Sequence, residues 1–354
     1  MPKTRAEARR WHGSHREELK MGAISTTQGR QTKLLGLGVH RPERVVTNDE
    51  ICEFIDSSDE WIQTRSGIKN RRFAEPEENV VQMSISAGKK ALEASGIAAE
   101  QIDTVIVATS THLELTPQAA AKVAHGLGTK GPAAFDICAG CAGFCYALAV
   151  ASDLVKAGTA QYVLVIGAEQ LSLTTDPYDR TTRFIFADGA GAVVVGQSDE
   201  TEIGPVVWGS DGSQSDAIVQ TIDWYDYITG EDAERPWIKM NGISVFRWAA
   251  FEMGKAAQKV LNVAGIKADE LHAFVPHQAN SRITELLAKS LNLNEETPVA
   301  NDIAETGNTS AASIPLAMEE LLRTGKAKEG DTALLLAFGA GLSYAGQVVK
   351  LPKL

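Results

Sequence analysis

The 354-residue sequence lacks any run of 18 or more apolar residues, which argues against a membrane-spanning helix. Residues 1–31 are rich in Arg, Lys, Glu and Ser but lack the apolar stretch that a secretory signal needs. We therefore expect a cytoplasmic protein with no membrane partner. Residues 1–31 are expected to be a disordered tail, because they offer too little apolar surface to offset the entropy lost on ordering.

Cysteine and positive charge are also scarce. Of only four cysteines, Cys138, Cys141 and Cys145 fall within eight residues, so a disulfide framework is not expected. The formal net charge of −11 argues against general nucleic-acid binding, because neutralising phosphates requires a basic excess. An acidic partner would need a local basic patch.

The strand-forming segments indicate a layered α/β protein. Hydrophobic residues make up 44% of the chain and charged residues 22%, as in globular proteins with a large core. Short β-branched runs alternate with amphipathic stretches, and their hydrophobicity is continuous, which is typical of sheets covered on both faces. The runs occupy 33–38, 104–109, 133–137, 162–167 and 192–196, then 205–209, 272–276, 332–339 and 347–351.

The two halves of the chain repeat one spacing. The offsets are 169 residues from Thr104 to Ala273, 170 from Tyr162 to Thr332, and 167 from Cys141 to Asn308. Three nearly equal offsets indicate a duplication and predict a five-layered αβαβα body. Residues 32–203 would form the first half, which contains Cys141. Residues 204–354 would form the second half, which contains His277 and Asn308. The alternative is two unrelated α/β domains in tandem.

Cys141 lies in FDICAGCAGF (135–144), an apolar run that continues into a helical pattern. At a helix N-terminus, the peptide dipoles and free N–H groups would lower the pKa of the thiol and make it a nucleophile. The alternative is a small buried hydrophobe. The CxxC spacing with Cys138 also permits a redox or metal site, but no second cysteine pair or Cys/His cluster in the sequence completes a zinc site.

His277 and Asn308 stand at two further strand-to-helix junctions, VPHQAN (275–280) and TGNTSAASIP (306–315). Sites in α/β proteins gather at strand ends, and a duplication would bring both residues to Cys141. Alone, His277 could be a satisfied core histidine and Asn308 a helix cap. The glycine-rich turn AFGAGLSYAG (337–346) could supply an N–H group to an oxyanion hole with that of Cys141. Dinucleotide binding is not indicated, because the GxGxxG pattern and its helix are missing.

Six segments in this order resemble the β-ketoacyl-acyl carrier protein (ACP) synthase III family of thiolase-superfamily condensing enzymes: RPERVVTNDEI, SSDEWIQTRSGIKNRRFA, CAGCAGF, IFADGAGAVVV, VPHQAN and GNTSAAS. The resemblance extends from about Thr32 to Leu354. Residues 57–74 and FGAGLSYA are especially similar to the actinobacterial branch, which includes mycobacterial enzymes. The resemblance to this family implies a thiolase-like αβαβα fold.

The resemblance also implies a reaction in fatty acid or mycolic acid biosynthesis. Cys141 would take an acyl group from acyl-CoA, and the backbone N–H groups of Cys141 and Ala340 would hold the oxyanion. Decarboxylation of malonyl-ACP would then give a carbanion equivalent, with neutral His277 and Asn308 donating hydrogen bonds to the enolate oxygen. Attack on the acyl-cysteine would give β-ketoacyl-ACP. No metal or other cofactor is implied.

Substrate-binding residues follow from the same resemblance. Those that match CoA contacts are Trp61, Arg65, Ser57, Arg180 and Asn280, with Trp61 and Arg180 stacking on the adenine. Those that match the basic docking patch for ACP are Arg247, Arg282 and Lys289. The alternatives are a half-buried packing role for Trp61 and ordinary solvated charges.

Two positions depart from the family pattern. Ile243 replaces a polar residue near the pantetheine, and Thr116 stands where relatives restricted to short primers have phenylalanine. A smaller residue at 116 would lengthen the acyl channel across the interface of the homodimer that the family implies. We therefore expect a medium or long acyl-CoA primer.

Three functions stay open at this point. The first is the condensing enzyme described above. The second is a relative in specialised metabolism that joins an acyl-CoA to a different nucleophile. The third is not a condensing enzyme: an acyl-CoA or carrier-protein binding scaffold, or a metal or redox module that uses Cys138 and Cys141.

Overall fold

The computed structural model describes residues 29–230 and 234–354. The predicted tail over 1–31 lies mostly outside the described residues. Its last residue does not belong to a tail, because Gln31 begins the first strand and pairs with Ser198. The first strand therefore starts one residue before the predicted boundary.

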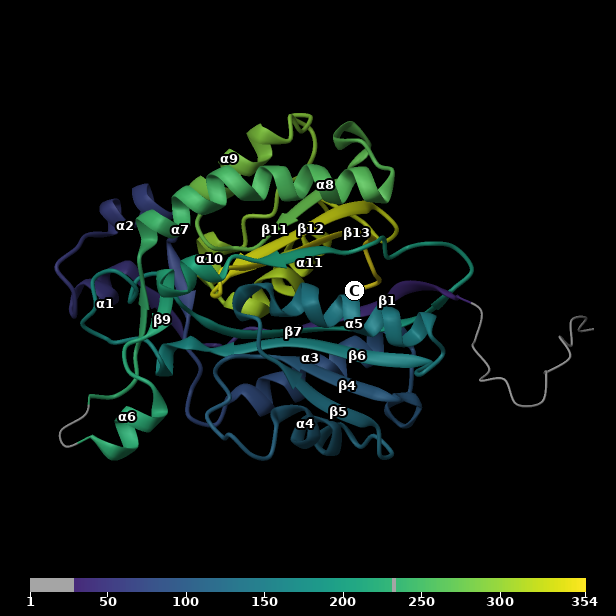
Figure 1. Cartoon of the computed structure of the whole chain (residues 1–354), viewed down its shortest axis with the longest axis horizontal. Coiled ribbons are helices and arrows are strands. Elements are labelled where there is room, and N and C mark those ends of the chain that lie inside the picture. Colours follow the sequence, from purple (N-terminus) through teal and green to yellow (C-terminus); the bar gives the residue numbers. More distant parts are fainter. Residues whose placement is uncertain (1–28, 231–233) are drawn as a thin grey trace, which may run out of the picture.

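The body has five layers, as predicted (Figure 1). One outer layer contains helices α3 (Val80–Ser95) and α4 (Ala119–Leu127). The first sheet has the order β1 (Gln31–His40), β7 (Asp188–Ser198), β6 (Tyr162–Gln170), β4 (Thr104–Ala108) and β5 (Ala133–Ile137). The middle layer contains α5 (Gly143–Lys156) and α11 (Ser313–Arg323). The second sheet has the order β11 (Ala273–Pro276), β12 (Thr332–Gly339), β13 (Ser343–Lys350) and β8 (Val207–Ser210). Helices α8 (Gly254–Ala264) and α9 (Ser281–Ser290) form the other outer layer.

The strand pairings show the duplication that the offsets predicted. In the first sheet β4 is parallel to β5 and β6, whereas β7 is antiparallel to β6 and β1. The second sheet repeats this order: β11 is parallel to β12, and β13 is antiparallel to β12 and β8. The position of β5, parallel to β4 at the edge of the first sheet, also has a counterpart in the second sheet. There Val299 forms a single parallel bridge with Phe274 of β11. The division between residues 203 and 204 stays a prediction.

The two middle helices are buried because each packs against a sheet on both sides. Phe144 and Leu148 of α5 and Met318 of α11 are fully buried, in a cluster that also contains side chains of both sheets. A helix enclosed in this way must be apolar on most faces. The middle layer thus joins the two halves into one core.

Each middle helix is preceded by a 3-10 turn. The turns Gly140–Ala142 and Ser310–Ala312 lie 170 residues apart, contact each other, and begin with a left-handed residue, Gly140 at φ 51° and Ser310 at φ 48°. The repeat is therefore 170 residues, and the structural counterpart of Cys141 is Ala311. The prediction that Cys141 and Asn308 occupy equivalent positions is wrong by three residues, although both lie at the adjoining turns.

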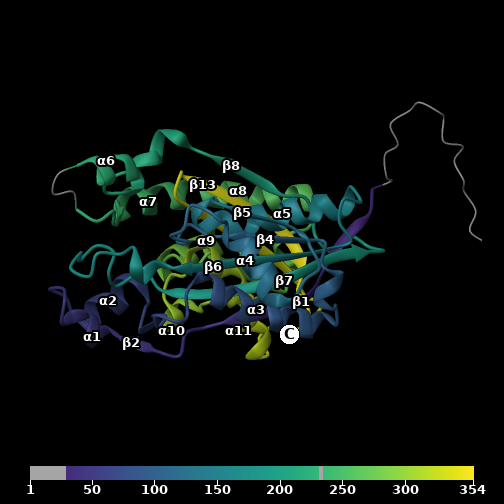
Figure 2. The same cartoon turned by 90° about the horizontal axis from the view of Figure 1, so that it is seen from below.

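Two excursions extend from one end of the layers, at the left of Figures 1 and 2. The first contains β2 (Val45–Thr47), α1 (Asn48–Cys52), α2 (Asp59–Ser66) and β3 (Asn70–Arg72). The second contains β9 (Ile218–Gln220), α6 (Trp224–Thr229), β10 (Ile238–Met240) and α7 (Gly242–Trp248). A π-helical turn, Ala249–Met253, connects α7 to α8. The short α10 (Ile303–Thr306) precedes the 310–312 turn.

No helix within the described ranges has both the length and the apolar character needed to cross a membrane.

Gly167 on β6 should be essential for the close approach of the first sheet to the 310–312 turn. A Cβ at this position would lie 2.3 Å from the Ala311 carbonyl oxygen, which is backbone and cannot move aside. We expect Gly167→Ala to lower the free energy of unfolding by about 1–3 kcal/mol, as measured by denaturant titration. The control is Gly212→Ala, where no atom lies within 4 Å of the added Cβ. Equal stability of the two variants would contradict the expectation.

Candidate active site

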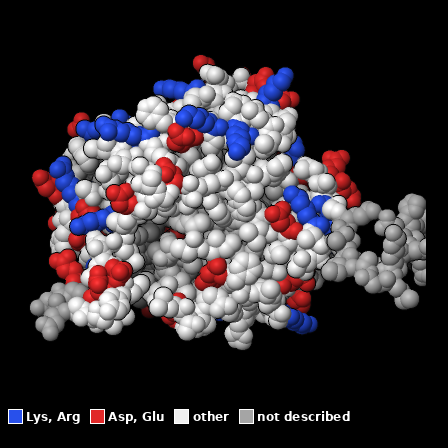
Figure 3. Space-filling model, in the orientation of Figure 1, with Lys and Arg blue, Asp and Glu red and all other residues white. Residues whose placement is uncertain are grey.

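A cavity of about 1190 Å³ is lined by Cys141, His277 and Asn308 together. These residues come from three different segments, and each lies beside the end of a strand or the start of a middle helix. The space-filling view shows a hollow on this face of the molecule (Figure 3). The predicted convergence of the cysteine, the histidine and the asparagine is therefore confirmed as geometry.

Cys141 sits inside the 3-10 turn that leads into α5, as the sequence pattern predicted. The turn after β12 packs directly against it. A Cβ on Gly339 would lie 2.7 Å from the Cys141 nitrogen and 2.9 Å from its Sγ, and a Cβ on Gly140 would lie 3.1 Å from the Ala340 nitrogen. Only glycines permit this approach, which brings the backbone of Ala340 beside the thiol.

The electrostatics of Cys141 differ from the prediction. Burial raises the pKa of the thiol to about 12, the Ser310 side chain lowers it through a hydrogen bond, and the negative charge of Glu169 raises it further. The expected lowering of the pKa by the helix N-terminus is thus wrong, because loss of water outweighs the helix dipole at a buried sulfur. The resting nucleophile is a protonated thiol and needs a proton acceptor when it reacts.

His277 follows β11 and is held on three sides. Its backbone N–H donates to the Leu336 carbonyl at 2.7 Å, and its Nδ1 lies 2.7 Å from the Ser313 hydroxyl. The ring also meets the edge of Phe338 at 5.5 Å between centroids. Burial lowers the pKa of the imidazole to about 3, so the ring is neutral near pH 7. Because Ser313 occupies Nδ1, the other ring nitrogen, Nε2, is the one left for a ligand in the cavity.

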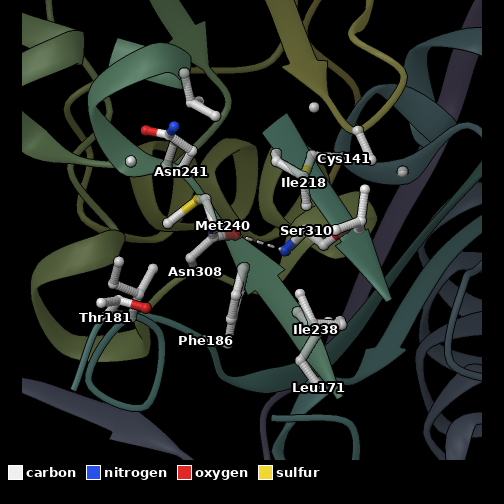
Figure 4. Close-up of a pocket in the computed structure, with 18 of the residues that line it drawn as sticks. Cys141, Leu171, Thr181, Phe186, Ile218, Ile238, Met240, Asn241, Asn308 and Ser310 are labelled. Atoms are coloured by element: carbon white, nitrogen blue, oxygen red, sulfur yellow. Dashed lines mark hydrogen bonds between the residues drawn. The ribbon is translucent and has the colours of Figure 1, made fainter. Parts of the chain in front are cut away.

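Asn308 is fixed so that its amide nitrogen stays available. Its backbone N–H donates to the Ile185 carbonyl, and its carbonyl accepts from the Ala187 N–H, both at 2.9 Å. The side-chain oxygen accepts from the Ser310 N–H at 2.8 Å (Figure 4). With that oxygen engaged, the amide NH₂ remains as a donor for the cavity.

One part of the cavity wall is apolar. Figure 4 shows Leu171, Phe186, Ile218, Ile238 and Met240 around the space beside Asn308 and Cys141. Three of these residues, Ile218, Ile238 and Met240, belong to the β9–β10 ribbon, so the second excursion forms part of the wall. A wall of this composition suits a hydrocarbon chain better than a polar ligand.

The predicted CoA residues Trp61 and Arg180 lie together at the cavity. The Arg180 guanidinium is 5.2 Å from the centroid of the Trp61 ring, and Arg65 approaches the same ring at 5.9 Å. Phe184 supports the indole by an edge contact at 5.4 Å. Arg180 is exposed, so it is free to swing aside for a planar ligand.

The two other predicted CoA residues differ in position. Asn280 lines the cavity, but its side chain caps α9 by accepting from the Arg282 N–H and donates to the Arg65 carbonyl at 3.0 Å. Asn280 is therefore the N-cap of α9, a role that the sequence analysis did not predict. Ser57 is not among the lining residues, and its hydroxyl is buried without a hydrogen-bond partner among the described residues.

The predicted docking cations surround part of the opening. Arg247 of α7 and Arg282 of α9 line the cavity, and Arg282 stacks on Phe246 at 5.6 Å. Lys289 is exposed further along α9 and does not line it. Lys and Arg side chains also gather along the upper part of the face in Figure 3. Ile243, the apolar departure from the family pattern, is exposed at this opening.

Thr116 does not line the cavity of its own chain. It lies exposed in the loop between β4 and α4, whereas Leu113 and Leu115 of that loop do line the cavity. Among the described residues β5 pairs only with β4, and Gln118, at the end of the same loop, donates its side-chain N–H to the Ala134 carbonyl of β5 at 3.0 Å. An influence of Thr116 on an acyl chain would therefore have to act across a subunit interface.

Two residues beside Cys141 were missed from the sequence. Ser310 lines the cavity, and Glu169 is fully buried at the end of β6, where its carboxylate accepts from the Ser310 hydroxyl at 3.2 Å. A signal for Glu169 was present: an acid ends the apolar run YVLVIGAEQ at the end of a strand where sites gather. Ser310 carried no such signal, because its role depends on a contact between the two halves.

Within residues 29–230 and 234–354, no group of three or more His, Cys, Asp or Glu side chains is arranged to hold a metal ion. All four cysteines are free thiols. Cys138 also lines the cavity.

Comparisons with protein families agree with this geometry. Residues 135–212 match the model "3-Oxoacyl-[acyl-carrier-protein (ACP)] synthase III", and residues 261–351 match its C-terminal counterpart. The first match contains Cys141, and the second contains His277 and Asn308. Cys141, His277 and Asn308 therefore all fall inside matched regions.

Similar proteins cover nearly the whole chain. The mycobacterial β-ketoacyl-ACP synthase III of Mycobacterium avium is 57% identical over 94% of this chain and 99% of its own. The β-ketoacyl-ACP synthase III of Mycobacteroides abscessus is 60% identical over 90% and 94%, respectively. The priming β-ketosynthase of the R1128 polyketide pathway superposes with a TM-score of 0.92 at 44% identity, over 93% of this chain and 99% of its own. The synthase III of Aquifex aeolicus superposes with a TM-score of 0.84 at 40% identity, over 90% and 99%. The chain therefore belongs to the β-ketoacyl-ACP synthase III family of condensing acyltransferases.

Proposed function

We propose that this chain condenses an acyl-CoA with malonyl-ACP in fatty acid biosynthesis, through an acyl thioester on Cys141. One observation carries the proposal: a buried thiol, a neutral imidazole and a fixed amide donor line one cavity. A thiol can accept the acyl group, and the two donors suit a negatively charged oxygen. The family membership supports the same reaction.

In the first half-reaction Cys141 attacks the acyl carbonyl. The oxyanion would be held by the backbone N–H groups of Cys141 and Ala340. The packing of the β12–β13 turn against Cys141, which Gly140 and Gly339 permit, supports this pair of donors. CoA then leaves, and the acyl group remains on sulfur.

In the second half-reaction malonyl-ACP loses CO₂ and gives a carbanion equivalent. His277 through Nε2–H and Asn308 through its amide would donate hydrogen bonds to the enolate oxygen. A neutral donor suits this step, because it stabilises the developing charge without transferring its proton to the carbanion equivalent. The carbanion attacks the acyl carbon and releases β-ketoacyl-ACP. No step requires a metal or an organic cofactor.

The acyl primer is proposed to be of medium or long chain length. The apolar wall around Leu171, Phe186 and Met240 supports a hydrocarbon ligand. With a long primer, the condensation is proposed to serve mycolic acid biosynthesis. Thr116 would line the acyl channel of a partner subunit.

CoA would enter past Trp61, Arg65, Arg180 and Asn280, with the adenine between the indole and the Arg180 guanidinium. Ser57 would be a further contact only after a local rearrangement, since its hydroxyl is now buried. The carrier protein would dock on three cations, which are Arg247, Arg282 and Lys289. Their position on α7 and α9 beside the opening supports this.

A cytoplasmic homodimer is proposed as the working form. In the part of the chain that the structure describes, β5 pairs only with β4, and its Phe135 and Ile137 are half-buried. A free edge of this kind is a site for pairing with a second copy. The neighbouring Leu113 and Leu115 are 51% and 87% exposed, which adds apolar surface to the same region.

A priming condensing enzyme of specialised metabolism is the second candidate. It is favoured by the 44% identity to the R1128 priming ketosynthase. The higher identities of 57% and 60% to β-ketoacyl-ACP synthases III favour the first candidate.

Removing either enolate donor should separate the two half-reactions. We expect His277→Ala and Asn308→Ala to lower the single-turnover rate of malonyl-ACP condensation by about 10²–10³-fold while Cys141 is still acylated. Because burial holds the pKa of His277 at about 3, the imidazole stays neutral as pH falls from 8 to 5, and the condensation rate should show no titration of this residue. A decline in rate with a midpoint near the ordinary histidine pKa of about 6.5, absent from the His277→Ala background, would contradict this.

The choice of primer is tested with malonyl-ACP and acyl-CoA primers from two to sixteen carbons. We expect the highest kcat/KM with medium or long chains, because the cavity wall is apolar. The Cys141→Ala variant should form no product with any primer. A strong preference for acetyl-CoA over dodecanoyl-CoA would refute the chain-length proposal. Acylation without product would favour the second candidate.

The docking patch is tested by charge reversal. Arg247→Glu combined with Lys289→Glu should raise KM for malonyl-ACP at least about fivefold, since each exposed charge contact contributes up to about 1 kcal/mol. The effect should shrink at high salt. Lys328→Glu combined with Lys353→Glu, an equal charge change away from the cavity, is the control. A patch without this role would give the same KM in both variants.

A further inference from the structure

The fully buried Glu169 carboxylate has no role in the reaction described so far. It lies at the end of β6, and its oxygens accept hydrogen bonds from two directions. The loop after β4 contributes the Ser110 N–H at 3.1 Å, the Ser110 hydroxyl at 2.9 Å and the Thr111 hydroxyl at 2.5 Å. The Ser310 hydroxyl donates from the other half of the molecule at 3.2 Å.

These contacts indicate an ionised carboxylate in the resting protein. The Thr111 hydroxyl already accepts the Gln170 N–H at 2.8 Å, so its own hydrogen points to Glu169. The Ser110 backbone N–H can only donate. A group surrounded by donors is an acceptor, which is the behaviour of the ionised form. Burial raises the pKa of Glu169 and these hydrogen bonds lower it, so the carboxylate can also take up a proton from a neighbouring group.

Ser310 connects this carboxylate to the nucleophile. Its hydroxyl donates to Oε1 of Glu169, and its side chain lies close enough to Cys141 to lower the pKa of the thiol. Ser310 lies between Asn308 and Cys141 in the cavity wall (Figure 4). Its position depends on a left-handed backbone, φ 48°, which the Asn308 side chain holds by accepting the Ser310 N–H. The Ser310 hydroxyl thus lies next to both the thiol and the carboxylate.

We propose that Glu169 stores the Cys141 proton while the cysteine is acylated, with the Ser310 hydroxyl as the relay. The proposal rests on the proposed function of Cys141. It answers the need for a proton acceptor at a buried, protonated thiol. His277 is less suited to this task, because burial lowers the pKa of its imidazole to about 3.

Over the two half-reactions, every proton that leaves one group is accepted by another. During acylation the Sγ–H bond breaks, Ser310 takes this proton, and its own proton passes to Glu169. The bond between Sγ and the acyl carbon forms, and CoA leaves as a thiolate that takes a proton from solvent at neutral pH. During condensation the carbanion displaces Sγ, which recovers its proton from Glu169 through Ser310. One solvent proton is consumed per turnover, as decarboxylation of malonyl-ACP requires.

Proton uptake during acylation tests the proposal directly. Wild-type protein is mixed with an acyl-CoA, without malonyl-ACP, in weakly buffered solution near pH 7 with an indicator dye. Intact-mass measurement counts the acylated Cys141. We expect uptake of one proton per acylated site, because the cysteine proton stays on Glu169 while CoA takes one from solvent. Acylation without uptake would overturn the relay but leave the proposed function intact. Absence of acylation would overturn both.

Variants separate the relay from a structural role. Cys141→Ala with the same acyl-CoA gives the uptake caused by binding alone, which is subtracted. Glu169→Gln should show no uptake per acylated site. The thiol of Cys138 also senses the Glu169 charge, so Cys138→Ala should retain uptake if Cys141 is the proton source. Loss of uptake in Cys138→Ala would contradict the assignment.

The relay residue has a matched control. Ser310→Ala should lower the acylation rate by about 100-fold, at the low end of general acid–base contributions, with unchanged affinity for acyl-CoA. Thr109→Val removes another hydroxyl that donates to Glu169, but to Oε2 at 3.3 Å, away from Ser310. It should keep both the rate and the proton uptake. Equal losses in the two variants would show that the hydroxyls only hold Glu169 in place.

Discussion

The contact between two 3-10 turns is the constraint on which the site depends. The turns 140–142 and 310–312 start the two middle helices and meet between the sheets. Their approach leaves no room for side chains: Gly167 lies against the Ala311 backbone, and Gly339 lies against Cys141. Because both helices are enclosed by sheets, neither turn can withdraw without opening the core that joins the halves. The thiol, the amide of Asn308 and the Ser310 hydroxyl are placed together as a consequence.

The same burial sets the electrostatics of the site. Exclusion of water leaves His277 neutral and the Cys141 thiol protonated, with pKa values of about 3 and about 12. A neutral imidazole suits hydrogen-bond donation to an enolate, whereas a protonated thiol needs an acceptor for its proton. The one buried acid hydrogen-bonded to Ser310, Glu169, is held by donors from the loop after β4. One physical cause, loss of solvent, thus gives His277 and Cys141 opposite protonation behaviour and distinct tasks.

The duplicated core and the two excursions, each of which belongs to one half alone, have different roles: the core positions the reacting groups, and the excursions form part of the cavity wall. Strand β5 leads to Cys141, β11 leads to His277, and β12 leads to the turn that packs against the thiol. The β9–β10 ribbon adds apolar wall, and α2 adds Trp61. Residues of the cavity wall can therefore change without moving the strands that position the reacting groups. The likeness in fold to both a synthase III and a polyketide priming ketosynthase agrees with this view.

Local sequence patterns determined the strands, the duplication and the junctions that hold Cys141, His277 and Asn308. Strand β5 occupies the predicted residues 133–137, and β4 and β11 begin at Thr104 and Ala273, because continuous apolar runs report burial on both faces. Only the tertiary structure decided the rest. The pKa of Cys141 depends on water exclusion by both halves, the availability of Asn308 depends on its bond to Ser310, and Glu169 meets Ser310 across 141 residues. Such contacts join segments far apart in the chain, and no local pattern of residue types encodes them.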